Sequence, residues 1–178
     1  MTTGARSSQG WIIPYQAFEV SVTKALAAAA AYAVEDVMSE SATAGTSWSF
    51  ANVVPVNGGS GTIVKAIVSC ETTSVVPGIT LYLFTAVPTS ALNDNVANTA
   101  VLHADHADYV GIITFPQMAD LGGDSSAIVT TSLTTGNLPL PFICATGARG
   151  LFGIAVTRSV FTATAGDDLI IKLFIHQD

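Results

Sequence analysis

The feature that most constrains the fold of this 178-residue chain is an alternation of apolar and polar residues with a period of two. Phe18, Val20 and Val22 alternate with polar residues, and the same period recurs at residues 64–71 and 169–176. Successive side chains of a β-strand point to opposite faces. Each stretch therefore predicts a strand with one buried and one solvated face.

Turn signals separate the candidate strands at short intervals. They are rich in Gly, Asn and Asp, which supply the positive φ angles and local hydrogen bonds of tight turns. These signals lie at residues 57–61, 77–78, 120–124, 135–137 and 165–167. Further candidate strands lie at residues 48–54, 79–84, 109–115, 127–131, 138–144 and 151–156. Roughly eight or nine short strands favour an all-β fold, an antiparallel β-sandwich with jelly-roll topology that residues 17–178 form as one domain.

Two of these stretches, residues 79–84 and 151–156, are apolar on both faces. In a two-layer sandwich only one face of a strand meets the core. Hydrophobic residues make up 49% of the chain and charged residues 11%, and a lone globule exposing large apolar patches aggregates. We therefore expect the outer faces of these two strands to contact another subunit, and the protein to form a homo-oligomer.

A run of alanines at residues 27–31 conflicts with the strand pattern. Alanine is the best helix former and is depleted in strands, but the run lacks a well-placed Ser, Asp or Asn cap at its start. We expect a loop followed by a strand near residues 33–38. A short helix is the alternative.

Residues 1–16 predict an extended N-terminal arm. Residues 1–10 lack core-forming side chains and the apolar segment of a secretion signal. The residues expected to dock the arm on a neighbouring subunit are Trp11, Ile12, Ile13 and Tyr15.

The charge distribution argues against nucleic-acid binding. The formal net charge is −7, and the six basic residues are scattered singly, whereas phosphate neutralisation needs a basic stripe. The sequence also has no run approaching the roughly 20 apolar residues of a transmembrane helix. We expect no nucleic-acid and no membrane partner.

Little in the sequence points to catalysis. The P-loop and dinucleotide fingerprints are absent, and Thr62 stands where a nucleophile elbow needs its last glycine. We interpret residues 57–61 as a hairpin turn, and we predict that the protein is not an enzyme and has no catalytic residue and no cofactor. Cys70 and Cys144 lie in apolar stretches outside any metal-ligand spacing. They are expected to be buried free thiols in a protein made in a reducing cytoplasm.

One cluster has ligand chemistry: His103, Asp105, His106 and Asp108. Two imidazoles and two carboxylates within six residues could ligate a divalent metal, and on a helix His103 and His106 would share a face. A cupin-type site would need a His-x-His pair with a nearby glutamate, and the sequence has no such pair. We interpret the segment as a solvated turn or helix leading into a strand at Tyr109, with a carboxylate as cap, and predict no metal site. Metal binding is the alternative.

The order and spacing of short segments across residues 18–178 carry a family resemblance. The segments are residues 20–24, 31–33, 35–37, 81–84, 88–89, 91–95, 105–111, 139–142, 151–153, 161–162 and 173–178. Together they resemble small virion-associated structural proteins of tailed bacteriophages, the head decoration or cement proteins.

The resemblance implies a capsid decoration protein. Such a protein is a β-rich homotrimer on the outer capsid surface, made in the host bacterial cytoplasm, which stabilises the head by bridging major capsid protein subunits. A clamp that holds several subunits gains effective concentration once its first contact forms. Two alternatives stay open: a component of the tail fibre or baseplate, and a carbohydrate-binding β-sandwich that exposes some of its aromatic side chains.

Overall fold

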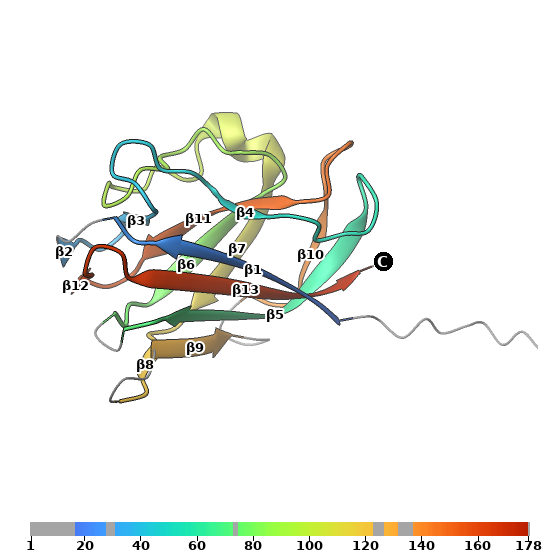
Figure 1. Ribbon diagram of the computed structural model, residues 1–178. Helices are drawn as coiled ribbons and strands as arrows, with labels where there is room; N and C mark the ends of the chain where they lie inside the picture. The colour runs from blue at the N-terminus through green and yellow to red at the C-terminus, as the bar shows by residue number, and fades with distance from the viewer. Residues whose placement is uncertain (1–16, 28–30, 73–74, 123–126, 132–136, 178) are drawn as a thin grey trace, which may run out of the picture.

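Figure 1 shows a computed structural model of the chain, which describes residues 17–27, 31–72, 75–122, 127–131 and 137–177. These residues form thirteen strands and one 3₁₀ helix. The elements are β1 (Ala17–Ala25), β2 (Ala31–Tyr32), β3 (Val37–Met38), β4 (Trp48–Phe50), β5 (Ser60–Cys70), β6 (Ile79–Phe84), η1 (His103–Asp108), β7 (Tyr109–Phe115), β8 (Ala119–Asp120), β9 (Ala127–Thr131), β10 (Leu140–Ile143), β11 (Leu151–Thr157), β12 (Phe161–Thr162) and β13 (Asp168–Gln177).

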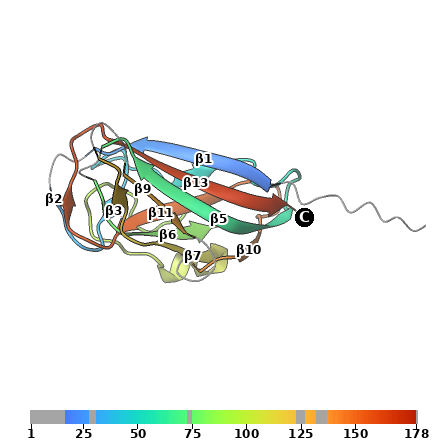
Figure 2. The same ribbon diagram turned by 90° about the horizontal axis from the view of Figure 1, so that it is seen from below.

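The strands form two main antiparallel sheets that lie face to face, as Figure 2 shows. The first sheet has the order β1-β13-β5-β9-β8, and β10 also pairs with β5. The second has the order β3-β11-β6-β7, and β4 also pairs with β11. A small sheet of β2 and β12 lies at the end of the molecule opposite β10. The predicted all-β, antiparallel class is therefore confirmed, consistent with a β-sandwich.

The core lies between the two sheets and follows the alternation seen in the sequence. On β13 the buried residues Leu169, Ile171, Leu173 and Ile175 alternate with partly exposed ones. Trp48 is buried opposite them, and its indole Nε1 donates a hydrogen bond to a backbone carbonyl at 3.0 Å. This pairing satisfies the polar end of a large apolar side chain.

A second apolar cluster covers the outer face of the second sheet. The buried side chains Phe84, Ile154 and Val156 point away from the main core and pack against the segment that joins β6 to η1. That segment contributes Leu92 and Val96, among others. The prediction that the outer faces of residues 79–84 and 151–156 contact another subunit is therefore wrong. The chain covers this face itself.

The alanine run is described only in part. Residues 28–30 lie outside the described residues, and Ala31 opens the short strand β2. A turn with Glu35 at a φ of 72° then leads into β3. The expected strand near residues 33–38 is thus two short strands with a turn between them. In the described part of the chain, the only helix is η1, and no helix is long and apolar enough to span a membrane.

The glycine-rich residues 57–61 form a turn, as predicted, but not a hairpin. The Gly58 N–H donates to the Ala148 carbonyl at 2.8 Å, and β5 begins at Ser60. The strands on either side, β4 and β5, belong to different sheets. The loop therefore carries the chain from one layer of the sandwich to the other.

Candidate functional site

The four side chains predicted to contact a partner, Trp11, Ile12, Ile13 and Tyr15, lie outside the described residues. The described chain begins at Ala17, the first residue of β1. The search for a functional site therefore concerns the surface of the sandwich itself.

An open groove of about 540 Å³ lies at one end of the sandwich. Three parts of the chain line it: the start of β5, the junction of η1 and β7, and the strand β10. The lining residues are Ser60, Gly61, Thr85, Ala107, Asp108, Tyr109, Val110, Pro141, Phe142 and Ile143. We call this depression the end groove.

The end groove is mainly apolar, and one wall faces solvent. Ile143 is 68% exposed, which is unusual for a large aliphatic side chain at the end of a strand. Phe142 is buried beneath it, and Tyr109 and Val110 are partly exposed on the facing wall. Burial raises the pKa of the Tyr109 hydroxyl, with a smaller contribution from Tyr82, so the ring is neutral at physiological pH.

The strand β10 forms one wall of the end groove because of how it pairs. It pairs with β5 over residues 140–143 only, so that Phe142 lies opposite Gly61 and Ile143 opposite Ser60. Pro141 has no backbone N–H, a property that limits further strand pairing at a sheet edge. Leu140 on β10 packs against β7 so closely that a Cβ on Gly111 would lie 2.9 Å from a Leu140 side-chain carbon.

The helix η1 is fixed beside the groove by the buried carboxylate of Asp105. The backbone N–H and hydroxyl of Thr89 both donate to Oδ1 at 2.7 Å. The N–H and hydroxyl of Ser90 donate to Oδ2 at 2.9 and 2.6 Å. Burial alone would raise the pKa of Asp105, but these hydrogen bonds outweigh it and lower the pKa. The carboxylate is therefore a structural acceptor that joins η1 to the loop after β6.

The structure does not bring the predicted ligand cluster together. His103 and His106 are exposed on η1, whereas Asp105 is buried and bonded as described above. Asp108 accepts a hydrogen bond from the Thr85 hydroxyl at 2.9 Å. Among the residues that the structure describes, no three His, Cys, Asp or Glu side chains are grouped to hold a metal ion. The interpretation as a helical turn leading into β7 is confirmed, but the expected carboxylate cap is wrong: Leu102 stands at the N-cap without a side-chain hydrogen bond, and Asp105 is buried rather than solvated.

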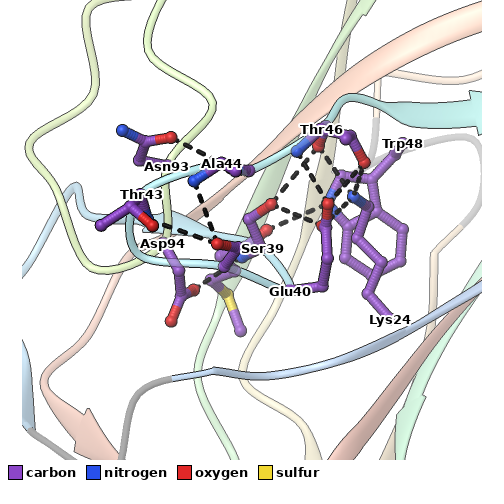
Figure 3. Close-up of polar contacts among 12 residues, drawn as sticks. Lys24, Ser39, Glu40, Thr43, Ala44, Thr46, Trp48, Asn93 and Asp94 are labelled. Carbon is purple, nitrogen blue, oxygen red and sulfur yellow. Dashed lines mark hydrogen bonds and ion pairs between the residues drawn. The ribbon is translucent and has the colours of Figure 1, made fainter.

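A second polar network fastens β1 to the loop between β3 and β4 (Figure 3). The buried Lys24 forms an ion pair with Glu40 and donates to the carbonyl and hydroxyl of Thr46 at 2.7 and 2.8 Å. Its ammonium also lies 5.7 Å from the centroid of a Trp48 ring. The Ser39 hydroxyl donates to Glu40 at 2.7 Å. The ammonium is thus surrounded by acceptors, as a buried charge requires.

The surroundings shift the pKa of both members of this ion pair. Burial, the largest influence, lowers the pKa of Lys24 against the opposing effect of Glu40. Burial would raise the pKa of Glu40, but hydrogen bonds from Lys24, Thr46 and Ser39 lower it to about 2. We regard the network as structural, because its donors and acceptors are directed at one another.

A smaller depression of about 360 Å³, lined in part by polar side chains, lies where β4 meets the start of β11. It contains the exposed side chains of Asn52, Asn57 and Arg149 and the partly exposed ring of Phe152. In the described part of the chain, Arg149 forms no side-chain ion pair, unlike Lys24, Arg158 and Lys172. Amides, a guanidinium and an aromatic ring are groups that bind sugars and carboxylates.

The outer face of the first sheet is open and of mixed character. Lys172 on β13 donates to Glu19 on β1 at 3.1 Å, and the Lys65 ammonium lies 4.7 Å from the centroid of the Phe174 ring. Ile67 on β5 is partly exposed on the same face. The charges on this face are therefore largely occupied by neighbours on the sheet.

Both cysteines are buried and free, as predicted. Burial raises the pKa of the Cys70 thiol to about 11, and burial also raises the pKa of Cys144. A thiol with a raised pKa is a poor nucleophile at neutral pH. Neither side chain is therefore placed for thiolate chemistry.

The end groove is the part of the surface that sequence reasoning missed. Its walls come from residues about 80 positions apart, such as Ser60 and Pro141, and only the pairing of β10 with β5 brings them together. Comparison with known protein families finds no matching family, and comparison with curated proteins finds no significant match. The function must therefore be argued from the residues and surfaces themselves.

Proposed function

We propose that this protein is a structural, non-enzymatic subunit of a tailed-phage virion, most specifically a capsid decoration protein. It would self-associate, as a trimer according to the family resemblance, and bridge major capsid protein subunits on the outer surface of the head. The observation that carries this proposal is the apolar end groove with the highly exposed Ile143 at its rim. Exposed apolar surface of this kind marks a site of protein contact.

The sequence outside the described residues supports the same proposal. Trp11, Ile12, Ile13 and Tyr15 are four apolar or aromatic side chains within five positions, immediately before the sandwich. We propose them as contact residues of an arm formed by residues 1–16. An arm that docks on a neighbour enlarges the contact area of an assembly subunit without a larger domain, and several such contacts reinforce one another.

We also propose that the sandwich has jelly-roll topology. Strand order supports this when the two-residue strands β2, β8 and β12 are left out and β3 with β4, and β9 with β10, are each counted as one strand. When these eight strands are numbered along the chain, they lie side by side in the order first, eighth, third, sixth in one sheet. In the other sheet the order is second, seventh, fourth, fifth. That arrangement is what two Greek keys folded together produce.

The test is to locate the protein on virions. Gold-labelled antibody against the purified protein is applied to intact virions from an infected culture, with virions from a mutant lacking the gene as control. Labelling over the heads is expected. Labelling confined to the tail would show that the protein is a tail-fibre or baseplate component and not a decoration protein. Unlabelled virions would exclude both roles.

A second candidate function is favoured by one observation, the depression around Arg149. Its free guanidinium, amides and aromatic ring suit an acidic sugar. Screening the protein on a glycan array, with Arg149→Ala in parallel, tests this function. Binding that the substitution abolishes would support a carbohydrate-binding module, whereas an array without hits would exclude it.

A further inference from the structure

We propose that Asn57 is a site of spontaneous chemical modification, at which the side-chain amide becomes a carboxylate when the loop between β4 and β5 opens. Asn57 is exposed, and Gly58 follows it directly, which makes this the only Asn-Gly pair in the sequence. The inference concerns the covalent structure of the chain itself. It therefore stands or falls independently of the proposed function.

The reaction needs water as its only co-reactant. The backbone nitrogen of Gly58 attacks the side-chain carbonyl carbon, Cγ, of Asn57, and the new N–C bond closes a succinimide ring. The bond from Cγ to the amide nitrogen breaks, and that nitrogen leaves as ammonia with the proton of the Gly58 N–H. Water then opens the ring at either carbonyl, which gives aspartate or isoaspartate. Glycine favours the attack because it has no Cβ to crowd its nitrogen.

The folded loop restrains this attack. The Gly58 N–H donates a hydrogen bond to the Ala148 carbonyl at 2.8 Å, and the Cys144 N–H donates to the Gly59 carbonyl at 2.9 Å. Gly58 has a φ of 69°, in the left-handed region that glycine adopts readily. The attacking nitrogen must give up a proton that the hydrogen bond to Ala148 engages. Local opening of the loop therefore has to precede the reaction.

Asn52 provides an internal comparison in the same part of the surface. It is exposed, it lines the same depression as Asn57, and the N–H of the next residue, Val53, donates to the Arg149 carbonyl at 2.8 Å. The two sites thus share exposure and the same kind of backbone hydrogen bond. They differ in the following residue, since Val53 is β-branched and crowds its own nitrogen. We therefore expect Asn52 to react slowly whether the loop is closed or open.

The modification would change the loop in two ways. Either product adds a negative charge to the depression that Asn57 shares with Arg149. Isoaspartate also carries the main chain through its side-chain carbon, which lengthens the backbone between Val56 and Gly58. The hydrogen bonds that join this loop to residues 144 and 148 would then no longer align. The modified loop would connect the two sheets less firmly.

Peptide mapping by mass spectrometry of the full-length protein tests the proposal. The protein is incubated at neutral pH, folded in buffer or unfolded in guanidinium chloride, and conversion at Asn57 and Asn52 is followed over time. Hydrogen exchange of the Gly58 N–H measures opening of the loop independently. Asn57→Gln is the control variant, because glutamine would have to close a larger ring. Ion-exchange chromatography detects the added negative charge in both proteins.

In the unfolded chain, we expect Asn57 to convert at least about tenfold faster than Asn52, and at least about tenfold faster than in the folded protein. Exchange of the Gly58 N–H should be slowed by folding at least as much. Equal rates at Asn57 in the folded and unfolded protein would overturn the role of the loop. Equal rates at the two asparagines in the unfolded chain, or an acidic species that forms as fast in Asn57→Gln, would overturn the assignment of the site.

Discussion

At the scale of single residues, three buried charged side chains hold the loops of the sandwich in place. Asp105 joins η1 to the loop after β6, and Lys24 joins β1 to the loop after β3. Asp94 accepts hydrogen bonds from the Tyr32 hydroxyl at 2.8 Å and from the Ser39 N–H at 2.7 Å. Each charge is surrounded by directed partners, so each fixes loops that have little regular secondary structure.

Replacing Asp105 by alanine tests this description. The change leaves two backbone N–H groups, of which that of Ser90 is buried, and two hydroxyls without their acceptor. We expect the free energy of unfolding to fall by about 3 kcal/mol, measured by urea denaturation. His106→Ala, exposed on the same helix, is the control and is expected to change stability by less than about 0.5 kcal/mol. Equal effects of the two substitutions would show that Asp105 is not a structural acceptor.

The ion pair of Lys24 and Glu40 predicts a pH dependence of stability. The pKa of Glu40 is lowered from 4.5 to about 2 on folding. Its contribution is therefore fully present above about pH 4.5 and is lost as the pH falls through about 2. Glu40→Gln is expected to be less stable than the unsubstituted protein by about 2 kcal/mol at pH 7, because Lys24 is left buried without its counter-charge.

Urea denaturation of both proteins from pH 7 down to pH 2 measures this difference. It should narrow steadily below pH 4.5 as the carboxylate of the unsubstituted protein becomes protonated. A difference that stays constant over this range would mean that the charge of Glu40 does not stabilise the fold.

At the scale of elements, the alternation of residues predicted most strands but not what covers them. Residues 109–115 and 127–131 are strands with the expected bounds, whereas only residues 48–50 of the expected strand 48–54 pair as one. A period-two pattern reports which face of a strand is buried. It does not say whether a neighbouring subunit or another part of the same chain buries it. The outer face of β6 and β11 is such a case.

The candidate site was less predictable than the fold for a related reason. The exposed Ile143 sits in an ordinary apolar stretch, and its exposure follows from β10 being short and paired on one side over four residues. Pairing between strands distant in sequence is a property of the folded chain. The clustered residues of η1, in contrast, were visible in the sequence, yet Asp105 turned inward and left the cluster incomplete.

The self-covered outer face makes a prediction about Ile154. Replacing this buried side chain by alanine leaves a cavity, and we expect unfolding to become easier by about 3 kcal/mol. Ile143→Ala, the same change at an exposed site, should alter stability by less than about 0.5 kcal/mol. The loss of stability caused by Ile154→Ala should be independent of protein concentration. Denaturation at protein concentrations that span about a hundred-fold range measures this. A loss of stability that depended on protein concentration would instead indicate that a neighbouring subunit buries this face.

At the scale of the whole molecule, 49% of the residues are hydrophobic and 11% are charged, so the fold has a large apolar surface to cover. The second apolar cluster covers part of this apolar surface. The end groove and residues 11–15 contribute further apolar surface. Eight large apolar side chains are still exposed in the described structure, Ile143 and Val160 most of all. These exposed side chains are the surface on which the proposed assembly into a larger particle would depend.

Removing residues 1–16 is expected to leave the sandwich folded but to weaken its attachment to phage heads. A chain lacking residues 1–16, supplied to virions that lack the wild-type protein, is expected to occupy heads at no more than about a tenth of the full-length level, since multivalent contacts reinforce one another. Occupancy is measured by quantitative gel analysis of purified heads, and circular dichroism checks that the shortened chain retains its strands. Undiminished occupancy by a folded chain would remove the arm from the contact.

The central claim is that this sandwich is a subunit built to bind copies of itself and the capsid on the outer surface of a phage head. Electron cryomicroscopy of purified virions tests it most directly. The claim predicts density of the size of this sandwich, clustered at the junctions between major capsid protein subunits and missing from virions that lack the gene. Identical heads with and without the gene would contradict it.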